Sequence, residues 1–121
     1  MTDIASIKSD FVQLRSGFST PDAALVDIFL NWLSAWREDD STVGVLMAGL
    51  DRILGQIWFS SNENHAKVAL LIARLRDTVA RIDGMTMNER LYAFGLMDRW
   101  DRTATAQRDN LYKKVLASKY A

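Results

Sequence analysis

The residues of this chain whose types could do chemistry are few and scattered. His65 is the only histidine, and the chain has no cysteine. The lack of cysteine excludes thiol catalysis, disulfides, zinc–thiolate sites and iron–sulfur clusters, and one histidine gives little support to a serine triad. His65 directly follows the turn at 60–64, so we interpret it as a surface or helix-capping residue.

Two groups of acidic residues deserve comparison with known catalytic and metal sites. Asp98 and Asp101 share a helix face, but they alternate with Arg99 and Arg102, which favours salt bridging over acid–base catalysis. The acidic segment 37–41 lacks the ligand spacing of a metal site, so we interpret it as a solvated turn. The chain also lacks a glycine-rich phosphate loop, a nucleophile elbow and a Glu-x-x-His pair. The sequence therefore predicts a protein that is not an enzyme and that holds no metal or cofactor.

Tryptophan and arginine are the residue types that point to a function, because both are enriched among interface hot spots. The chain has four tryptophans, and its arginines cluster near the last of them. The candidate interaction surface comprises Trp36, Arg90, Tyr92, Arg99, Trp100 and Arg102. This surface would bind another protein or a second copy of the chain.

The charges are balanced overall but unevenly distributed. Residues 1–64 carry a net charge of −5 and residues 65–121 a net charge of +5, with +4 in the segment 99–121. The two halves can attract one another within one fold, or unlike faces can attract between copies. A basic face for an acidic partner or nucleic acid is the third interpretation.

The elements that must position these residues are helices, and the segment 42–59 is the central one. Its apolar residues follow the spacing of one helical face. The predicted inward residues are Val43, Leu46, Met47, Leu50, Ile53, Leu54, Ile57 and Trp58. Gly44, Ala48 and Gly55 lie on another face, which a second helix or a ligand could approach closely unless that face is open to solvent.

Two helices precede the central one. The first carries a narrow apolar stripe from Ile4 to Phe18, which either docks on the bundle or forms a dimer seam. The second begins near Thr20 and Pro21, a typical helix start. It presents an unbroken apolar face of Leu25, Ile28, Phe29, Trp32, Leu33 and Trp36.

The remaining helices follow in the C-terminal half. A long helix covers 65–82, and Thr86 with Glu89 forms a capping box that starts a helix through Arg102. This helix is apolar on more than one side, with Tyr92, Leu96 and Trp100 on its second face, which is a further candidate dimer surface. In the last helix Leu111, Tyr112, Val115 and Leu116 are predicted to point inward and Lys113, Lys114 and Lys119 outward.

These patterns predict an all-α fold: a single compact antiparallel bundle of five to six helices over residues 1–121, with 1–18 as a peripheral helix if it does not dock. We find no signal peptide and no membrane span, and we expect a cytoplasmic protein.

The favoured function is a non-enzymatic protein–protein interaction module, such as a small adaptor, inhibitor or immunity-type protein, that can also self-associate. One alternative is a nucleic-acid-binding regulator that uses the basic segment from Arg99 to Lys119, although neutral overall charge disfavours it. The other is an apolar-ligand-binding bundle with a pocket lined by Trp32, Trp36 or Phe94.

Overall fold

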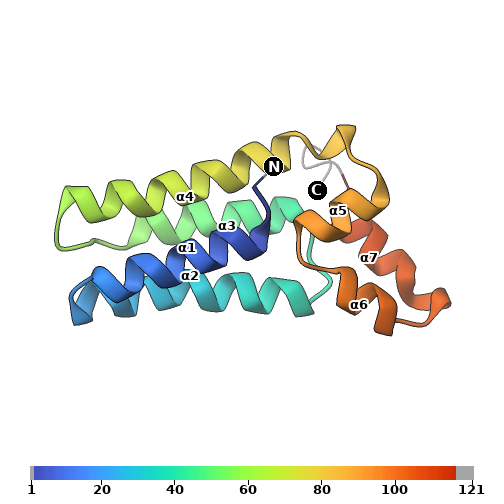
Figure 1. Cartoon of the computed structure of the whole chain (residues 1–121), viewed down its shortest axis with the longest axis horizontal. Helices are drawn as coiled ribbons and strands as arrows, with labels where there is room; N and C mark the ends of the chain where they lie inside the picture. The colour runs from blue at the N-terminus through green and yellow to red at the C-terminus, as the bar shows by residue number, and fades with distance from the viewer. Residues whose placement is uncertain (1, 117–121) are drawn as a thin grey trace.

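The computed structural model describes residues 2–116, and in this range the chain forms seven α-helices and no strand. The α-helices are α1 (Ile4–Gly17), α2 (Thr20–Glu38), α3 (Val43–Gln56), α4 (Asn62–Ala80), α5 (Met87–Ala93), α6 (Met97–Arg102) and α7 (Arg108–Lys114), with 3-10 turns η1 (Ile82–Gly84) and η2 (Thr105–Gln107). Figure 1 shows α1 to α4 side by side as four long rods, with α5, α6 and α7 gathered at one end. The prediction of an all-helical protein is confirmed.

The core lies between the four long helices, and α1 is a full member of it. Ile4, Ile7 and Phe11 of α1 are buried, and the ring of Phe11 stacks on Phe29 of α2 with centroids 5.6 Å apart. Arg15 and Arg74 add ion pairs from α1 to α2 and from α4 to α1, with Asp27 and Asp10 as their partners. The apolar stripe of α1 therefore docks within the monomer, and its alternative role as a dimer seam is wrong.

The inward face of α3 agrees with the sequence pattern except at its end. Val43, Leu46, Met47 and Leu50 are buried, as predicted. The helix ends at Gln56, and Ile57 adopts an extended conformation. Because helical periodicity stops there, Trp58 turns away from the core and is 87% exposed. The prediction that Trp58 belongs to the buried stripe is therefore wrong.

The predicted small-residue face of α3 is open to solvent at Ala48 and Gly55, which is the alternative to a close approach that the sequence left open. Ala48 and Gly55 are exposed, and a Cβ atom added at Gly55 would meet nothing within 4 Å. The close approach occurs instead at Gly49, where an added Cβ would lie 2.0 Å from Cζ2 of Trp32. The indole of Trp32 thus packs directly on the α3 backbone and donates from Nε1 to the carbonyl of Leu46 at 3.0 Å.

The number of helices exceeds the predicted five to six because the expected helix through Arg102 is divided into α5 and α6. The capping box is present: Thr86 Oγ1 accepts from the Glu89 backbone N–H, and Glu89 Oε1 accepts from that of Thr86. The division is at Gly95, which has a φ of +69°. The backbone N–H of Leu96 donates to the carbonyl of Leu91 at 2.8 Å, the bond that closes a Schellman motif.

The orientation of α7 also differs from the sequence pattern. Lys114 is completely buried, whereas Tyr112 is about half exposed, so the predicted directions of these two side chains are wrong. Leu111 and Val115 are buried as predicted. Lys119 lies outside the residues that the structure describes.

Candidate functional site

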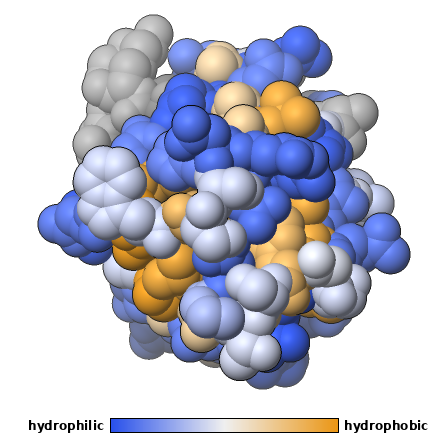
Figure 2. All heavy atoms as spheres, turned by 90° about the vertical axis from the view of Figure 1, so that its left-hand side faces the viewer, coloured by the Kyte–Doolittle hydropathy of each residue, from blue (hydrophilic) through white to orange (hydrophobic). Residues whose placement is uncertain are grey.

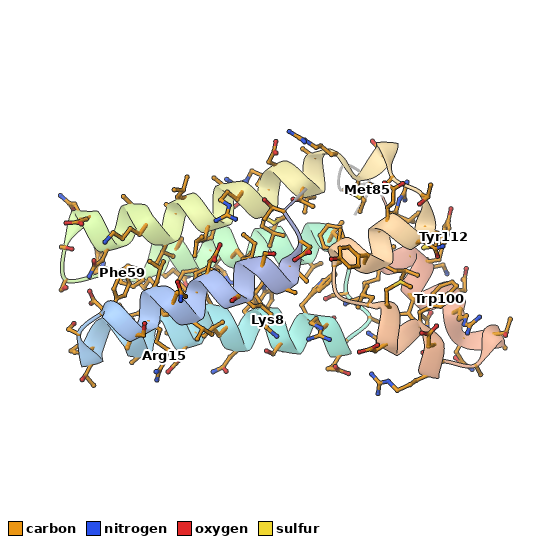
Figure 3. The ribbon with its side chains drawn as sticks, in the orientation of Figure 1. Lys8, Arg15, Phe59, Met85, Trp100 and Tyr112 are labelled. Carbon is orange, nitrogen blue, oxygen red and sulfur yellow. The ribbon has the colours of Figure 1, made fainter. Side chains whose placement is uncertain are left out.

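The end of the bundle formed by the α1–α2 and α3–α4 connections displays the most exposed large apolar side chain among the described residues, that of Trp58. Large aromatic residues are seldom left almost entirely in water by a stable monomer, because each carries 150–250 Å² of surface. We call residues 57–61, which connect α3 to α4, the Trp58 loop. Figure 3 shows the labelled Phe59 at this end of the molecule, far from Trp100 and Tyr112.

A buried carboxylate fixes the Trp58 loop. Asp22, in the first turn of α2, is only 2% exposed. It accepts hydrogen bonds from the Ser60 backbone N–H at 3.0 Å, from the Ser60 hydroxyl at 2.6 Å and from Asn64 Nδ2 at 2.8 Å. The hydrogen bonds from Ser60 and Asn64 hold the pKa of Asp22 below its ordinary value. The loop is therefore tied both to α2 and to the start of α4.

Aromatic rings hold the same loop from the other side. The ring of Phe59 makes edge contacts with Phe18, at 6.0 Å between centroids, and with His65, at 6.2 Å. Beside these rings lies a hollow of about 190 Å³ lined by Trp58, Phe59, Ser61, Asn62 and His65. Figure 2 faces this end and shows apolar patches interleaved with hydrophilic side chains. An exposed tryptophan on an anchored loop is thus set next to a small recess.

Sequence reasoning missed this site for an identifiable reason. Trp58 fits the helical period of α3, so the pattern assigned it to the core, and Asp22 fits the N-terminal turn of a helix. The available signal was the run Ser60, Ser61, Asn62, which marks a turn and places Trp58 close to a helix end.

The six residues of the predicted interaction surface do not form one exposed patch. Trp36 is 1% exposed, so its inclusion in the surface is wrong. Its Nε1 donates to the carbonyl of Thr42 at 2.9 Å, and its ring makes an edge contact with Phe94 at 6.0 Å. These contacts enclose Trp36 within the core, so Trp36 does not form the wall of an open pocket.

Arg90 and Arg99 act as internal hydrogen-bond donors. Arg99 donates to the carbonyls of Arg37 and Asp39 at the end of α2, at 3.0 and 2.6 Å, and to Asp40 Oδ1 at 2.6 Å. Arg90 donates to the carbonyls of Met85 and Val115 at 3.1 and 3.2 Å. Cations at a helix C-terminus satisfy carbonyls that have no partner within the helix. The segment 37–41, expected to be a solvated turn, is exposed at residues 38–40 and also accepts hydrogen bonds from Arg99 of α6.

The other three residues are partly or largely accessible. Tyr92 is 64% exposed, and Arg102 is exposed with its Nε donating to the carbonyl of Asp98 at 3.3 Å. Trp100 is partly buried beneath Arg108, whose guanidinium lies 5.0 Å from the ring centroid. Tyr92 and Arg102 are thus the exposed members of the predicted surface.

Lys114 completes the contacts at the end of α2. Its ammonium donates to Asp39 Oδ1 at 2.9 Å and to the carbonyl of Ser41 at 2.8 Å, and lies 3.8 Å from the centroid of the Trp36 ring. Burial lowers the pKa of Lys114, although the hydrogen bond and charge of Asp39 act in the opposite direction. Burial alone would raise the pKa of Asp39, but the hydrogen bonds from Ser41 and Lys114 leave it below its ordinary value.

No group of three or more His, Asp or Glu side chains within residues 2–116 is arranged to hold a metal ion. None of the helices in this range has the length and apolar character needed to cross a membrane.

Comparison of the chain with protein-family models, with curated proteins and with solved structures gives no match.

Proposed function

We propose that this protein is a non-enzymatic protein-interaction module of the adaptor, inhibitor or immunity type, and that it binds its partner through the Trp58 loop. The observation that carries the proposal is the 87% exposure of Trp58 on a loop anchored by Asp22. Burying a tryptophan of about 200 Å² at about 25 cal/mol per Å² gives an upper estimate of about 5 kcal/mol. One such residue is sufficient for a binding hot spot.

The anchoring of the loop matters as much as the exposure. A flexible loop loses conformational entropy when it binds, whereas a loop already held in place binds with a smaller loss. The hydrogen bonds of Asp22 and the edge contacts of Phe59 supply this order before a partner arrives. The hollow beside Trp58 is large enough for one apolar side chain of the partner, whose contact would enclose the indole.

The proposal is tested by comparing the wild type with Trp58→Ala and with Tyr112→Ala, a half-exposed aromatic at the far end of the molecule. Proteins captured from a host lysate are identified by mass spectrometry, and the Kd of each purified partner is then measured. We expect Trp58→Ala to weaken binding by at least about 30-fold, which corresponds to about 2 kcal/mol, and Tyr112→Ala to have little effect.

Sedimentation equilibrium of the same three proteins tests the second copy as the partner. A wild-type dimer that becomes monomeric in Trp58→Ala identifies the partner as the chain itself. If no protein or second copy binds, or if Trp58→Ala binds as the wild type does with an unchanged Tm, the proposal is wrong.

A further inference from the structure

A second recess lies at the opposite end of the long helices, where α1 begins, α2 ends and α5 meets α6. Its volume is about 200 Å³, and it is lined by Asp3, Ala5, Arg37, Tyr92, Gly95, Met97 and Asp98. An engineered cavity of 150 Å³ accommodates benzene, so this recess has room for a molecule somewhat larger than that. We call it the Tyr92 pocket.

The backbone turn at Gly95 positions the guanidinium of Arg37 in the Tyr92 pocket. Gly95 adopts a φ of +69°, which side chains disfavour, and an added Cβ would lie 3.0 Å from Cγ2 of Ile4. Its carbonyl accepts a hydrogen bond from Arg37 Nε at 3.2 Å. This bond holds the guanidinium by its inner nitrogen, and the two terminal nitrogens of Arg37 make no hydrogen bond with the described residues.

A second cation, Lys8, lies near Arg37, although it does not line the pocket. Within residues 2–116, neither Arg37 nor Lys8 forms an ion pair, and the ammonium of Lys8 donates only to Ser34 Oγ at 3.2 Å. Partial burial and the nearby charge of Arg37 lower the pKa of Lys8. Two neighbouring cations that form no ion pair within residues 2–116 favour the binding of an anionic group at Arg37.

The same recess is also lined by two carboxylates, those of Asp3 and Asp98. The Asp98 carboxylate is exposed and makes no hydrogen bond or ion pair with the described residues. Asp3 uses Oδ1 to cap α1, accepting from the Ser6 backbone N–H at 2.7 Å, and keeps its other oxygen available. The exposed Tyr92 and the partly buried Met97 also line the recess.

We propose that the Tyr92 pocket binds a small zwitterion of the α-amino-acid class, with its carboxylate on Arg37, its ammonium on Asp98 and Asp3, and its side chain against Tyr92 and Met97. Within residues 2–116 Arg37 forms an ion pair with neither Asp3 nor Asp98, although all three line the recess. A ligand with both charges can therefore meet an unpaired cation and an unpaired carboxylate there, whereas a singly charged ligand also meets a like charge. This site is separate from the Trp58 loop and does not depend on the function proposed for it.

The test uses three probes of nearly equal size: L-phenylalanine, L-phenylalaninamide, which lacks the carboxylate, and 3-phenylpropionate, which lacks the ammonium. Amide chemical shifts of the ¹⁵N-labelled full chain are followed during titration. We expect saturable shifts at Ala5, Gly95 and Met97 with phenylalanine, at a Kd of about 1 mM or below. Each singly charged probe is expected to bind at least tenfold more weakly.

Two substitutions assign the charges to their partners. Asp98→Asn is expected to weaken the binding of phenylalanine but not that of 3-phenylpropionate. Arg37→Gln is expected to weaken the binding of phenylalanine but not that of phenylalaninamide. Asp101→Asn, exposed on the same short helix and outside the pocket, is the control. Arg37→Met, which removes the charge and keeps an apolar stem, replaces Arg37→Gln if the latter lowers the Tm. The inference is overturned if phenylalanine gives no saturable shift, if either singly charged probe binds equally well, or if both Asp98→Asn and the Arg37 variant leave phenylalanine binding unchanged.

Discussion

At the residue scale, one close contact between α2 and α3 depends on a residue without a side chain, Gly49. The indole of Trp32 lies on the backbone of α3 at Gly49, donates to the Leu46 carbonyl and carries the guanidinium of Arg52 over its ring at 5.5 Å. Gly55, six residues later on the same helix, has open space around it. Two glycines of one helix therefore have opposite roles: one is required by a neighbour, and the other only weakens the helix.

This contrast predicts opposite effects for the same substitution. Gly49→Ala should lower the free energy of unfolding by about 1–3 kcal/mol, because the indole must move from its site. Gly55→Ala should raise it by up to about 1 kcal/mol, because alanine favours the helix and meets nothing. Urea denaturation followed by tryptophan fluorescence measures both. A Gly49→Ala variant at least as stable as the wild type would contradict the packing described here.

At the scale of elements, α6 and α7 are attached to the end of α2 by cations. Arg99 and Lys114 together occupy the carbonyls of Arg37, Asp39 and Ser41 and the carboxylates of Asp39 and Asp40. Because α6 and α7 contain six and seven residues, each is too short to be stable without such contacts.

Removing the buried ammonium of Lys114 should therefore break more than one contact. We expect Lys114→Ala to lower the free energy of unfolding by about 2–4 kcal/mol, since it leaves a cavity against Trp36 and an unpaired carbonyl at Ser41. Lys114→Met, which retains the apolar stem, should recover part of this loss. The control is Lys113→Ala, whose exposed pair with Asp109 should contribute less than about 0.5 kcal/mol. Equal stability of the two alanine variants would refute a structural role for Lys114.

At the scale of the whole molecule, the carboxylates of Asp22, Asp27, Asp39 and Glu89 link the stability of the fold to pH. Each has a pKa below its ordinary value in the folded protein. The unfolded chain, with pKa values of about 4, consequently binds more protons in acid than the folded protein does. The stabilisation is fully present above about pH 4 and is lost as the pH falls through the lowered folded-state pKa values.

We therefore expect the Tm to fall as the pH is lowered from about 4 to about 2. Asp22→Asn should lower the Tm at pH 7 by about 5 °C, because one amide oxygen replaces a carboxylate that accepts from Ser60 and Asn64. The difference from the wild type should shrink as the pH falls, since the wild-type carboxylate is then protonated. Differential scanning calorimetry over this pH range measures the Tm of both proteins, and Asp101→Asn is the control for net charge. A gap that stays constant with pH would be inconsistent with the Asp22 contacts.

The whole-molecule distribution of charge leads to a further prediction. Arg90, Arg99, Arg108 and Lys114 donate to carbonyls, and Lys113 pairs with Asp109, so most of the positive charge in the C-terminal third is already engaged. We expect no retardation of a random DNA duplex by about 10 µM protein at low salt, where even non-specific binders give a shift. A shift that disappears as salt is raised would instead support the nucleic-acid-binding alternative.

The sequence by itself determined the helices, because their periodicity, caps and turn residues act locally. The all-helical fold, the apolar stripe of α1 and the capping box of α5 follow from spacing alone, whereas the docking of that stripe within the monomer was decided by the tertiary structure. The break at Gly95 was not predicted, since a glycine within an apolar run does not reveal its φ.

The tertiary structure decided which side chains are buried and which are displayed. Trp36 and Lys114 became buried because a cation, an aromatic ring and free helix carbonyls meet where α7 crosses the end of α2. Trp58 became exposed because α3 ends two residues before it. Asp22 holds the Trp58 loop in place through Ser60, which lies 38 residues later in the chain. Such contacts join segments far apart in sequence, and local periodicity carries no information about them.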